Sequence, residues 1–211
     1  MNNNLHPHQK EELAELAVIA MRERGLAPAF GPAVRQQLDT IDGPAEDEGP
    51  DIDDLTGLLW CSIDNDDSRD LDQLTVSETL PDGGVKLLVA IADVDALVSK
   101  DTPIDRHAQI NTTSVYTSAR IFPMLPEKLS TDLTSLNPHQ VRVATVTEMV
   151  FAADGTLLRS HIRRARVRNR APIGLLAPME ALTGGQLAPV RLPYEVLDAG
   201  ERTIDLPLAT L

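Results

Sequence analysis

The chain of 211 residues carries 32 acidic and 19 basic side chains, a formal net charge of −13, and is 42% hydrophobic but only 3% aromatic. It is long enough for one large domain, or one domain with an appendage, built on aliphatic residues. Because no run of about 18 apolar residues occurs, we expect a cytoplasmic protein with no signal peptide and no membrane contact. The single cysteine, Cys61, excludes an intramolecular disulfide and a thiolate metal cluster.

Two helices are predicted near the N-terminus. Residues 8–24 show apolar side chains at helical spacing, and Gly25 is placed to end that helix. Residues 32–38 begin with proline, which is favoured in a first helical turn. Residues 1–41 are therefore predicted to form a helical unit, either a packing appendage or a small helix-turn-helix that contacts nucleic acid.

The acidity of the chain is local. Residues 42–72 hold twelve acidic side chains and one arginine, a net charge of −11, which leaves −2 for the remainder. Residues 42–54 contain two Gly-Pro dipeptides and seven acids, a composition typical of a solvated linker. We place a domain boundary at this linker, with residues 55–211 forming the next unit.

The region after the linker is predicted to be mostly β. Strands are expected over residues 57–63, 72–78, 85–91, 141–151 and 157–167. Turn sequences at 81–84 and 153–156 predict hairpins, and short helices are expected over 103–111 and 177–182. The predicted fold class is α+β, with a helical unit followed by a β-rich part.

Five aspartates fall within nine positions, in a segment of residues 64–72 that follows a predicted strand. Crowded carboxylates are unfavourable unless a cation neutralises them, and Mg²⁺ is held in proteins by carboxylates, water and substrate phosphate oxygens. Such a metal could polarise a phosphodiester and activate water. Asp64, Asp70 and Asp72 lie beside apolar residues, which a solvated acidic loop explains poorly.

A calcium loop of the EF-hand kind is a competing interpretation of this segment. Asp64, Asp66 and Ser68 would take ligand positions one, three and five. Position six, however, is Arg69 instead of glycine, and position twelve is Thr75 instead of glutamate. A divalent-metal site and a solvated acidic loop remain as the two alternatives.

Several motifs match one known family. They are Ile63-Asp64, Asp70-Leu71-Asp72, Ile91-Ala92-Asp93-Val94, Thr113-Ser114-Val115-Tyr116, the segment 121–130 and Ser135-Leu136-Asn137-Pro138. Through these motifs roughly residues 55–172 resemble the ribonuclease II (RNB) family of exoribonucleases. We therefore expect the chain to be the N-terminal part of such a catalytic domain.

The resemblance implies processive hydrolysis of single-stranded RNA from the 3′ end, with Mg²⁺ and release of nucleoside 5′-monophosphates. It implies that Asp64, Asp70 and Asp72 are catalytic and bind the metal. Gln73 would be a further metal ligand. Tyr116 matches a family tyrosine that stacks against the 3′-terminal nucleotides, a use of aromatic rings suited to unpaired bases. Taken alone, Tyr116 is better explained as a packed strand aromatic.

A basic segment lies within the last predicted strand and continues just beyond it. It contains Arg159, Arg163, Arg164, Arg166, Arg168 and Arg170. In an extended strand the four even-numbered arginines would share one face. Such a row could follow RNA phosphates, form a charged edge that discourages aggregation, or pair with the acidic loop.

The chain departs from the family pattern at three places. Gln73 stands where the family usually has a second adjacent aspartate, and Leu175 stands where it commonly has a tyrosine that clamps RNA. The chain ends at Leu211, before the arginine-rich active-site motif of the family. The alternative function is therefore a catalytically impaired RNA-binding or interaction module with a truncated RNB domain.

Overall fold

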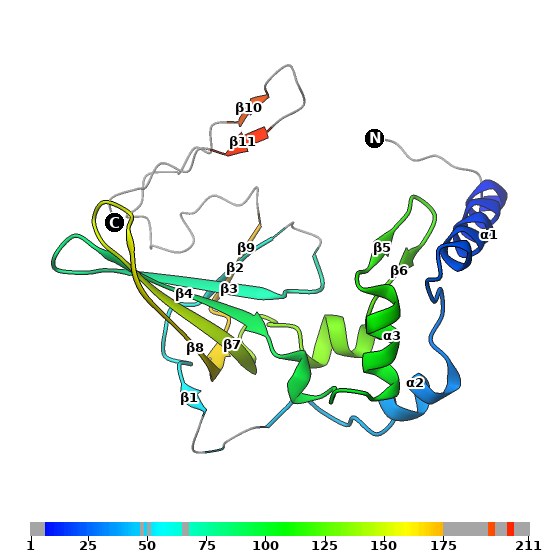
Figure 1. The fold of residues 1–211 in the computed structure, drawn as a ribbon, viewed down its shortest axis with the longest axis horizontal. Helices are drawn as coiled ribbons and strands as arrows, with labels where there is room; N and C mark the ends of the chain where they lie inside the picture. Colours follow the sequence, from blue (N-terminus) through cyan, green and yellow to red (C-terminus); the bar gives the residue numbers. More distant parts are fainter. Residues whose placement is uncertain are drawn as a thin grey trace.

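The computed structural model describes residues 7–46, 49, 52–64, 68–174, 194–196 and 202–204. Its elements are α1 (Pro7–Glu23), α2 (Pro32–Leu38), β1 (Asp53–Asp54), β2 (Cys61–Asp64), β3 (Gln73–Thr79), β4 (Val85–Ala92), η1 (Val94–Ala96), α3 (Pro103–Asn111), β5 (Val115–Tyr116), β6 (Ile121–Phe122), η2 (Lys128–Leu133), β7 (Val141–Phe151), β8 (Leu157–Arg168), β9 (Ala171–Gly174), β10 (Tyr194–Val196) and β11 (Arg202–Ile204). The architecture is α+β, as predicted (Figure 1). None of the helices in these residues is both long and apolar enough to cross a bilayer.

The described residues form one seven-stranded sheet in the order β1-β8-β7-β4-β3-β2-β9. Strands β3, β4, β7 and β8 are antiparallel, and both predicted hairpins are confirmed. The first turn requires glycine at Gly84, because a Cβ there would lie 2.5 Å from the carbonyl oxygen of Phe151. At the edges, β1 pairs with β8 and β9 pairs with β2 in the parallel sense.

One face of this sheet buries the main core. The core residues are Trp60, Leu71, Leu74, Leu88, Ala90, Leu136, Ala144, Val146, Ala165 and Val167. Along each long strand these residues alternate with more exposed ones, so a register slip of one residue would move them to the other face. Because full burial of one large aliphatic side chain contributes about 1.5–3 kcal/mol, the apolar pattern fixes the register.

A second core joins the helices. Its buried members are Val34, Val98, Ile104, Leu125, Leu129 and Leu133. Gln37 of α2 accepts a hydrogen bond from the backbone N–H of Ile104 at the start of α3, at 2.8 Å. At the other end of α3, buried Asn111 bonds both the N–H and the carbonyl of Ala27. The segment containing α2 therefore lies against α3, as Figure 1 shows.

The predicted elements agree closely with the structure where their signals are local. α2, α3 and β7 have the predicted bounds, while β2 is shorter than expected because it begins only at Cys61. The two acidic residues of β1 were expected in a linker, yet they pair with β8. The helix predicted over 177–182 lies outside the described residues.

Asn169 connects three parts of the sheet. Its side chain is almost fully buried. The amide nitrogen donates to the hydroxyl of Ser62 and to the carbonyl of Leu136, both at 3.0 Å. The amide oxygen accepts from the N–H of Ala171 at 3.2 Å. Asn169 thus ties β2 and β9 to the segment that precedes β7.

We expect Asn169→Ala to lower the free energy of unfolding by about 1–3 kcal/mol, because it leaves buried donors and acceptors without partners. Urea denaturation of the 211-residue chain measures this change. The control is Gln109→Ala, which removes an exposed hydrogen bond to Asp105 on α3 and should change stability by less than about 0.5 kcal/mol. Equal effects of the two substitutions would contradict the role assigned to Asn169.

Candidate active site

One cavity of about 620 Å³ collects the residues predicted to carry the chemistry. It lies where the end of β2, the loop before β3, the β5–β6 hairpin and the start of η2 meet. Its lining residues are Asp64, Ser68, Arg69, Asp70, Asp72, Ser114, Tyr116, Ile121, Pro123, Glu127, Ser130 and Thr131. The three predicted catalytic aspartates and the predicted stacking tyrosine therefore share one cavity.

The aspartates are close enough to influence one another. Burial raises the pKa of Asp72, and repulsion from Asp70 and Asp64 raises it further. Asp64 is the last residue of β2, and its carboxylate accepts a 2.5 Å hydrogen bond from the hydroxyl of Ser68. The cavity thus holds a concentration of negative charge that a cation would relieve.

The backbone around Leu71 fixes the segment Asp70-Leu71-Asp72 against the sheet. Leu71 is buried in the main core, and its carbonyl accepts a hydrogen bond from the N–H of Leu136 at 2.8 Å. The carbonyl of Asp72 accepts one from the N–H of Ala92 at the end of β4, at 2.9 Å. The aspartates therefore lie on either side of an anchored residue.

The donors fit a hard divalent cation in kind. Carboxylate oxygens are the ligands that Mg²⁺ prefers, and the ion usually takes only one or two of them with water and substrate phosphate. Among the described residues, no three carboxylate, imidazole or thiol groups converge closely enough to hold an ion by themselves. Asp66 and Asp67 lie outside the described residues. The observed carboxylates therefore match an open site that water and phosphate complete.

Gln73 is placed differently from the three aspartates. It begins β3, faces Ile91 of β4 across the sheet and is exposed. Among the described residues, the cavity lining does not include it. The structure therefore lends no geometric support to Gln73 as a metal ligand, and that role stays a prediction.

Tyr116 is a surface residue of the cavity wall. It pairs with Ile121 across the β5–β6 hairpin, both side chains line the cavity, and Tyr116 is 67% exposed. The ring is therefore not a packed core aromatic. It is available to a flat apolar group such as a nucleobase.

The sequence did not predict that residues in and just before η2 line the cavity. Glu127, Ser130 and Thr131 line the cavity beside Tyr116, although they lie more than fifty positions after Asp72 in the sequence. All three lie within or beside the matched segment 121–130, but no local pattern shows that this segment faces the aspartates. Only the packing of η2 brings them there.

Several arginines of the basic segment pair with acidic side chains. Arg163 contacts Asp53 at 2.6 Å and Glu148 at 3.1 Å, and Arg166 contacts Asp54 at 2.8 Å. Both aspartates belong to the strand β1 at the end of the acidic linker. These pairs show ion pairing for Arg163 and Arg166, with partners in β1 and β7. Phosphate contact and the charged-edge role stay predictions.

Arg164 makes a further pair on the same strand. Its Nε lies 2.6 Å from the carboxylate of Asp93, which is buried, and its Nη2 lies 2.7 Å from Asp95. A buried carboxylate requires such a partner, because an isolated charge in the interior is costly. Arg164 therefore holds η1 against β8.

Comparison with known proteins agrees with these observations. A family model described as the RNB domain matches residues 52–185. Ribonuclease R of Escherichia coli is 36% identical over 170 residues, which is 80% of this chain and 21% of that protein. Exoribonuclease 2 of Salmonella paratyphi B is 40% identical over 111 residues, 53% of this chain and 17% of that protein. The chain spans about a fifth of the length of these relatives.

A solved structure shares the fold. The structure of Mycoplasma genitalium RNase R in complex with double-stranded RNA superposes with a TM-score of 0.71 and 28% sequence identity. The match covers 83% of this chain and 31% of that one. The fold of this chain is therefore shared with a known architecture.

The repulsion within the cavity gives a direct prediction. We expect Asp70→Asn to lower the pKa of Asp72, because it removes one of the neighbouring charges that raise it. A titration followed by carboxyl ¹³C NMR measures this pKa. Asp39→Asn, at the end of α2, is the control and should leave it unchanged. An unchanged pKa in Asp70→Asn would show that the two carboxylates do not interact.

Proposed function

Because the chain belongs to the RNB domain family, we propose that it carries the aspartate part of a Mg²⁺-dependent exoribonuclease site. The proposed reaction is hydrolysis of single-stranded RNA from the 3′ end, with release of nucleoside 5′-monophosphates. The observation that supports it most directly is the cavity shared by Asp64, Asp70, Asp72 and Tyr116.

In this proposal Asp64, Asp70 and Asp72 hold Mg²⁺ together with water and RNA phosphate oxygens. The ion would polarise the scissile phosphodiester and lower the pKa of the attacking water. The aspartates contribute the negative charge that attracts the ion, and that charge, after burial, is the second cause of the raised pKa of Asp72. Binding of a cation would favour the ionised form of each carboxylate.

The remaining walls of the cavity suit a nucleotide chain. Tyr116 and Ile121 offer an apolar surface for a base, while Glu127 and Ser130 offer polar atoms at the side of η2. Arg69 lies in the same lining and supplies a positive charge for a phosphate. The paired arginines of β8 are not needed as phosphate contacts in this arrangement.

The first experiment is a gel time course with 5′-labelled single-stranded RNA and Mg²⁺. We expect the 211-residue chain to shorten the RNA from its 3′ end. Asp72→Asn should slow this by roughly 100-fold or more, the effect of removing one group that stabilises a transition state, and EDTA should stop it. Asp39→Asn is the matched control and should retain the rate of the unchanged chain.

Intact RNA in the wild-type reaction would contradict an active site in this chain. If the RNA were bound but not cut, the catalytically impaired RNA-binding module would be the better account. Shortening that persists in both Asp72→Asn and EDTA would mean that the cavity is not the site of cleavage.

A second experiment tests the contact with the base. We expect Tyr116→Ala to raise the dissociation constant for a short single-stranded RNA by roughly 5- to 150-fold, the range for loss of one base-stacking ring. Tyr116→Phe keeps the ring and should stay within about twofold. Fluorescence anisotropy in EDTA measures both without cleavage. Equal affinities for Tyr116→Ala and Tyr116→Phe would contradict stacking.

A further inference from the structure

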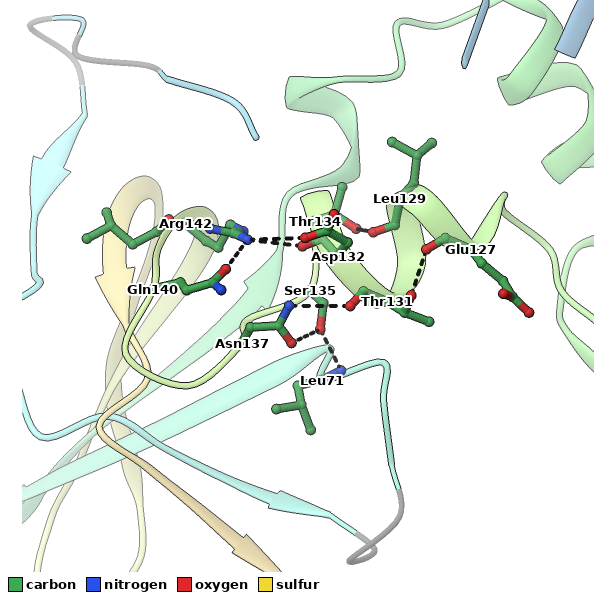
Figure 2. A network of polar contacts seen from close by, with 11 residues as sticks. Leu71, Glu127, Leu129, Thr131, Asp132, Thr134, Ser135, Asn137, Gln140 and Arg142 are labelled. Atoms are coloured by element: carbon green, nitrogen blue, oxygen red, sulfur yellow. Dashed lines mark hydrogen bonds and ion pairs between the residues drawn. The ribbon is translucent and has the colours of Figure 1, made fainter. Parts of the chain in front are cut away.

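Leu71 is held on both of its backbone groups and on its side chain. Its carbonyl accepts from the N–H of Leu136, and its own N–H donates to the hydroxyl oxygen of Ser135 at 3.0 Å (Figure 2). Its side chain is 7% exposed and packs in the main core. Asp70 and Asp72, the residues on either side, both line the cavity. Whatever fixes Leu71 therefore also fixes the spacing of these two carboxylates.

The hydroxyl of Ser135 has a defined direction. Ser135 is 0% exposed, so its polar atoms depend on protein partners. Its oxygen accepts from Leu71, and its hydrogen is donated to the amide oxygen of Asn137 at 3.1 Å. An amide oxygen can only accept and an amide nitrogen can only donate. Asn137 therefore keeps the oxygen of Ser135 turned toward Leu71.

The same network reaches η2, which also contributes residues to the cavity lining. The amide nitrogen of Asn137 donates to the carbonyl of Thr131 at 3.3 Å. The hydroxyl of Thr131 donates to the carbonyl of Glu127 at 2.8 Å. Thr131 and Glu127 both line the cavity. Figure 2 shows this chain of bonds running from Leu71 through Ser135 and Asn137 to η2.

Arg142 holds the other end of η2. It lies in β7 and is mostly buried, and its guanidinium donates to the carbonyl of Asp132 at 3.1 Å and to the side chain of Gln140 (Figure 2). Burial lowers the pKa of Arg142, while Asp132 opposes that shift. The element to which Asn137 is bonded is therefore itself fixed to the sheet.

We propose that Ser135, oriented by Asn137, is a positioning residue that sets the spacing of Asp70 and Asp72 and thereby the affinity of the cavity for a divalent cation. Repulsion drives the two carboxylates apart, and the bond to Leu71 opposes any tilt of the backbone between them. This inference rests on the proposed function, because it assumes that the aspartates bind a cation. It assigns to the Ser135–Asn137 pair the orienting role that outer groups have at metal sites.

If Ser135 only stabilised the fold, its loss would lower stability without changing the affinity for the cation. A substitution at Thr134 serves as the control for that case. Thr134 is also buried, and its hydroxyl donates to the carbonyl of Leu129 within η2, at 3.0 Å. Thr134→Val removes a buried hydroxyl next to Ser135 while keeping the shape of the side chain. It should lower the thermal unfolding midpoint without changing the affinity for the cation.

The test is an Mn²⁺ titration of the 211-residue chain, followed by the electron paramagnetic resonance signal of the free ion. We expect Ser135→Ala to weaken Mn²⁺ binding by roughly 10-fold, the lower end of the range for outer groups that orient metal ligands, because Ser135 acts through the backbone of Leu71. Asn137→Ala should also weaken Mn²⁺ binding. Because Asn137 is partly exposed, this variant is expected to fold more readily than Ser135→Ala. Thermal unfolding midpoints compare the stability of all variants with that of Thr134→Val.

The outcomes are distinct. Weaker Mn²⁺ binding in Ser135→Ala or Asn137→Ala, with unchanged binding in Thr134→Val, supports the positioning role. Equal Mn²⁺ affinity in the wild-type chain and in folded Ser135→Ala and Asn137→Ala overturns it and leaves the proposed function standing. Absence of Mn²⁺ binding in the wild-type chain overturns the metal site itself, and the positioning role with it.

Discussion

The mutual repulsion of three carboxylates is the constraint on which this site depends. Asp64, Asp70 and Asp72 line one cavity, and the pKa of Asp72 is raised partly because the other two are charged. Left to themselves, such groups would separate or take up protons. The surrounding structure opposes separation. Asp64 is fixed as the last residue of β2, and Asp70 and Asp72 flank Leu71, whose backbone is hydrogen-bonded on both sides.

The fold supplies that anchoring with apolar burial and backbone hydrogen bonds. Leu71 belongs to the same core as Trp60 and the alternating residues of the long strands. The segment 135–138, which follows η2, provides Ser135 and Leu136 to the two backbone groups of Leu71. The core of the sheet, the segment Asp70-Leu71-Asp72 and η2 are therefore packed together. A substitution in that core would be expected to shift the carboxylates.

The parts of this structure that can be predicted from the sequence are those determined by neighbouring residues. α2 and α3 begin with proline and β7 is long and apolar, so their bounds follow from nearby residues. β1 and β9 are short edge strands paired in parallel with distant segments, and no local pattern identifies them. The aspartates and Tyr116 were found through motifs. Glu127 and the link from Ser135 to Leu71 depend on contacts between segments about sixty residues apart.

The arginines of β8 offset part of the negative charge of this acidic chain. Phosphate contact, a charged edge and pairing with acidic residues were all open to them, and in the structure Arg163 and Arg166 pair with Asp53 and Asp54 at the end of the acidic linker. That pairing reduces the negative charge at the end of the linker, while the aspartates of the cavity remain an electrostatic obstacle to a phosphate. A divalent cation at those aspartates would remove the obstacle, since the ion is then the largest local charge. Cation binding and RNA binding at this cavity are therefore expected to favour each other, as required of two ligands that attract one another in a shared site.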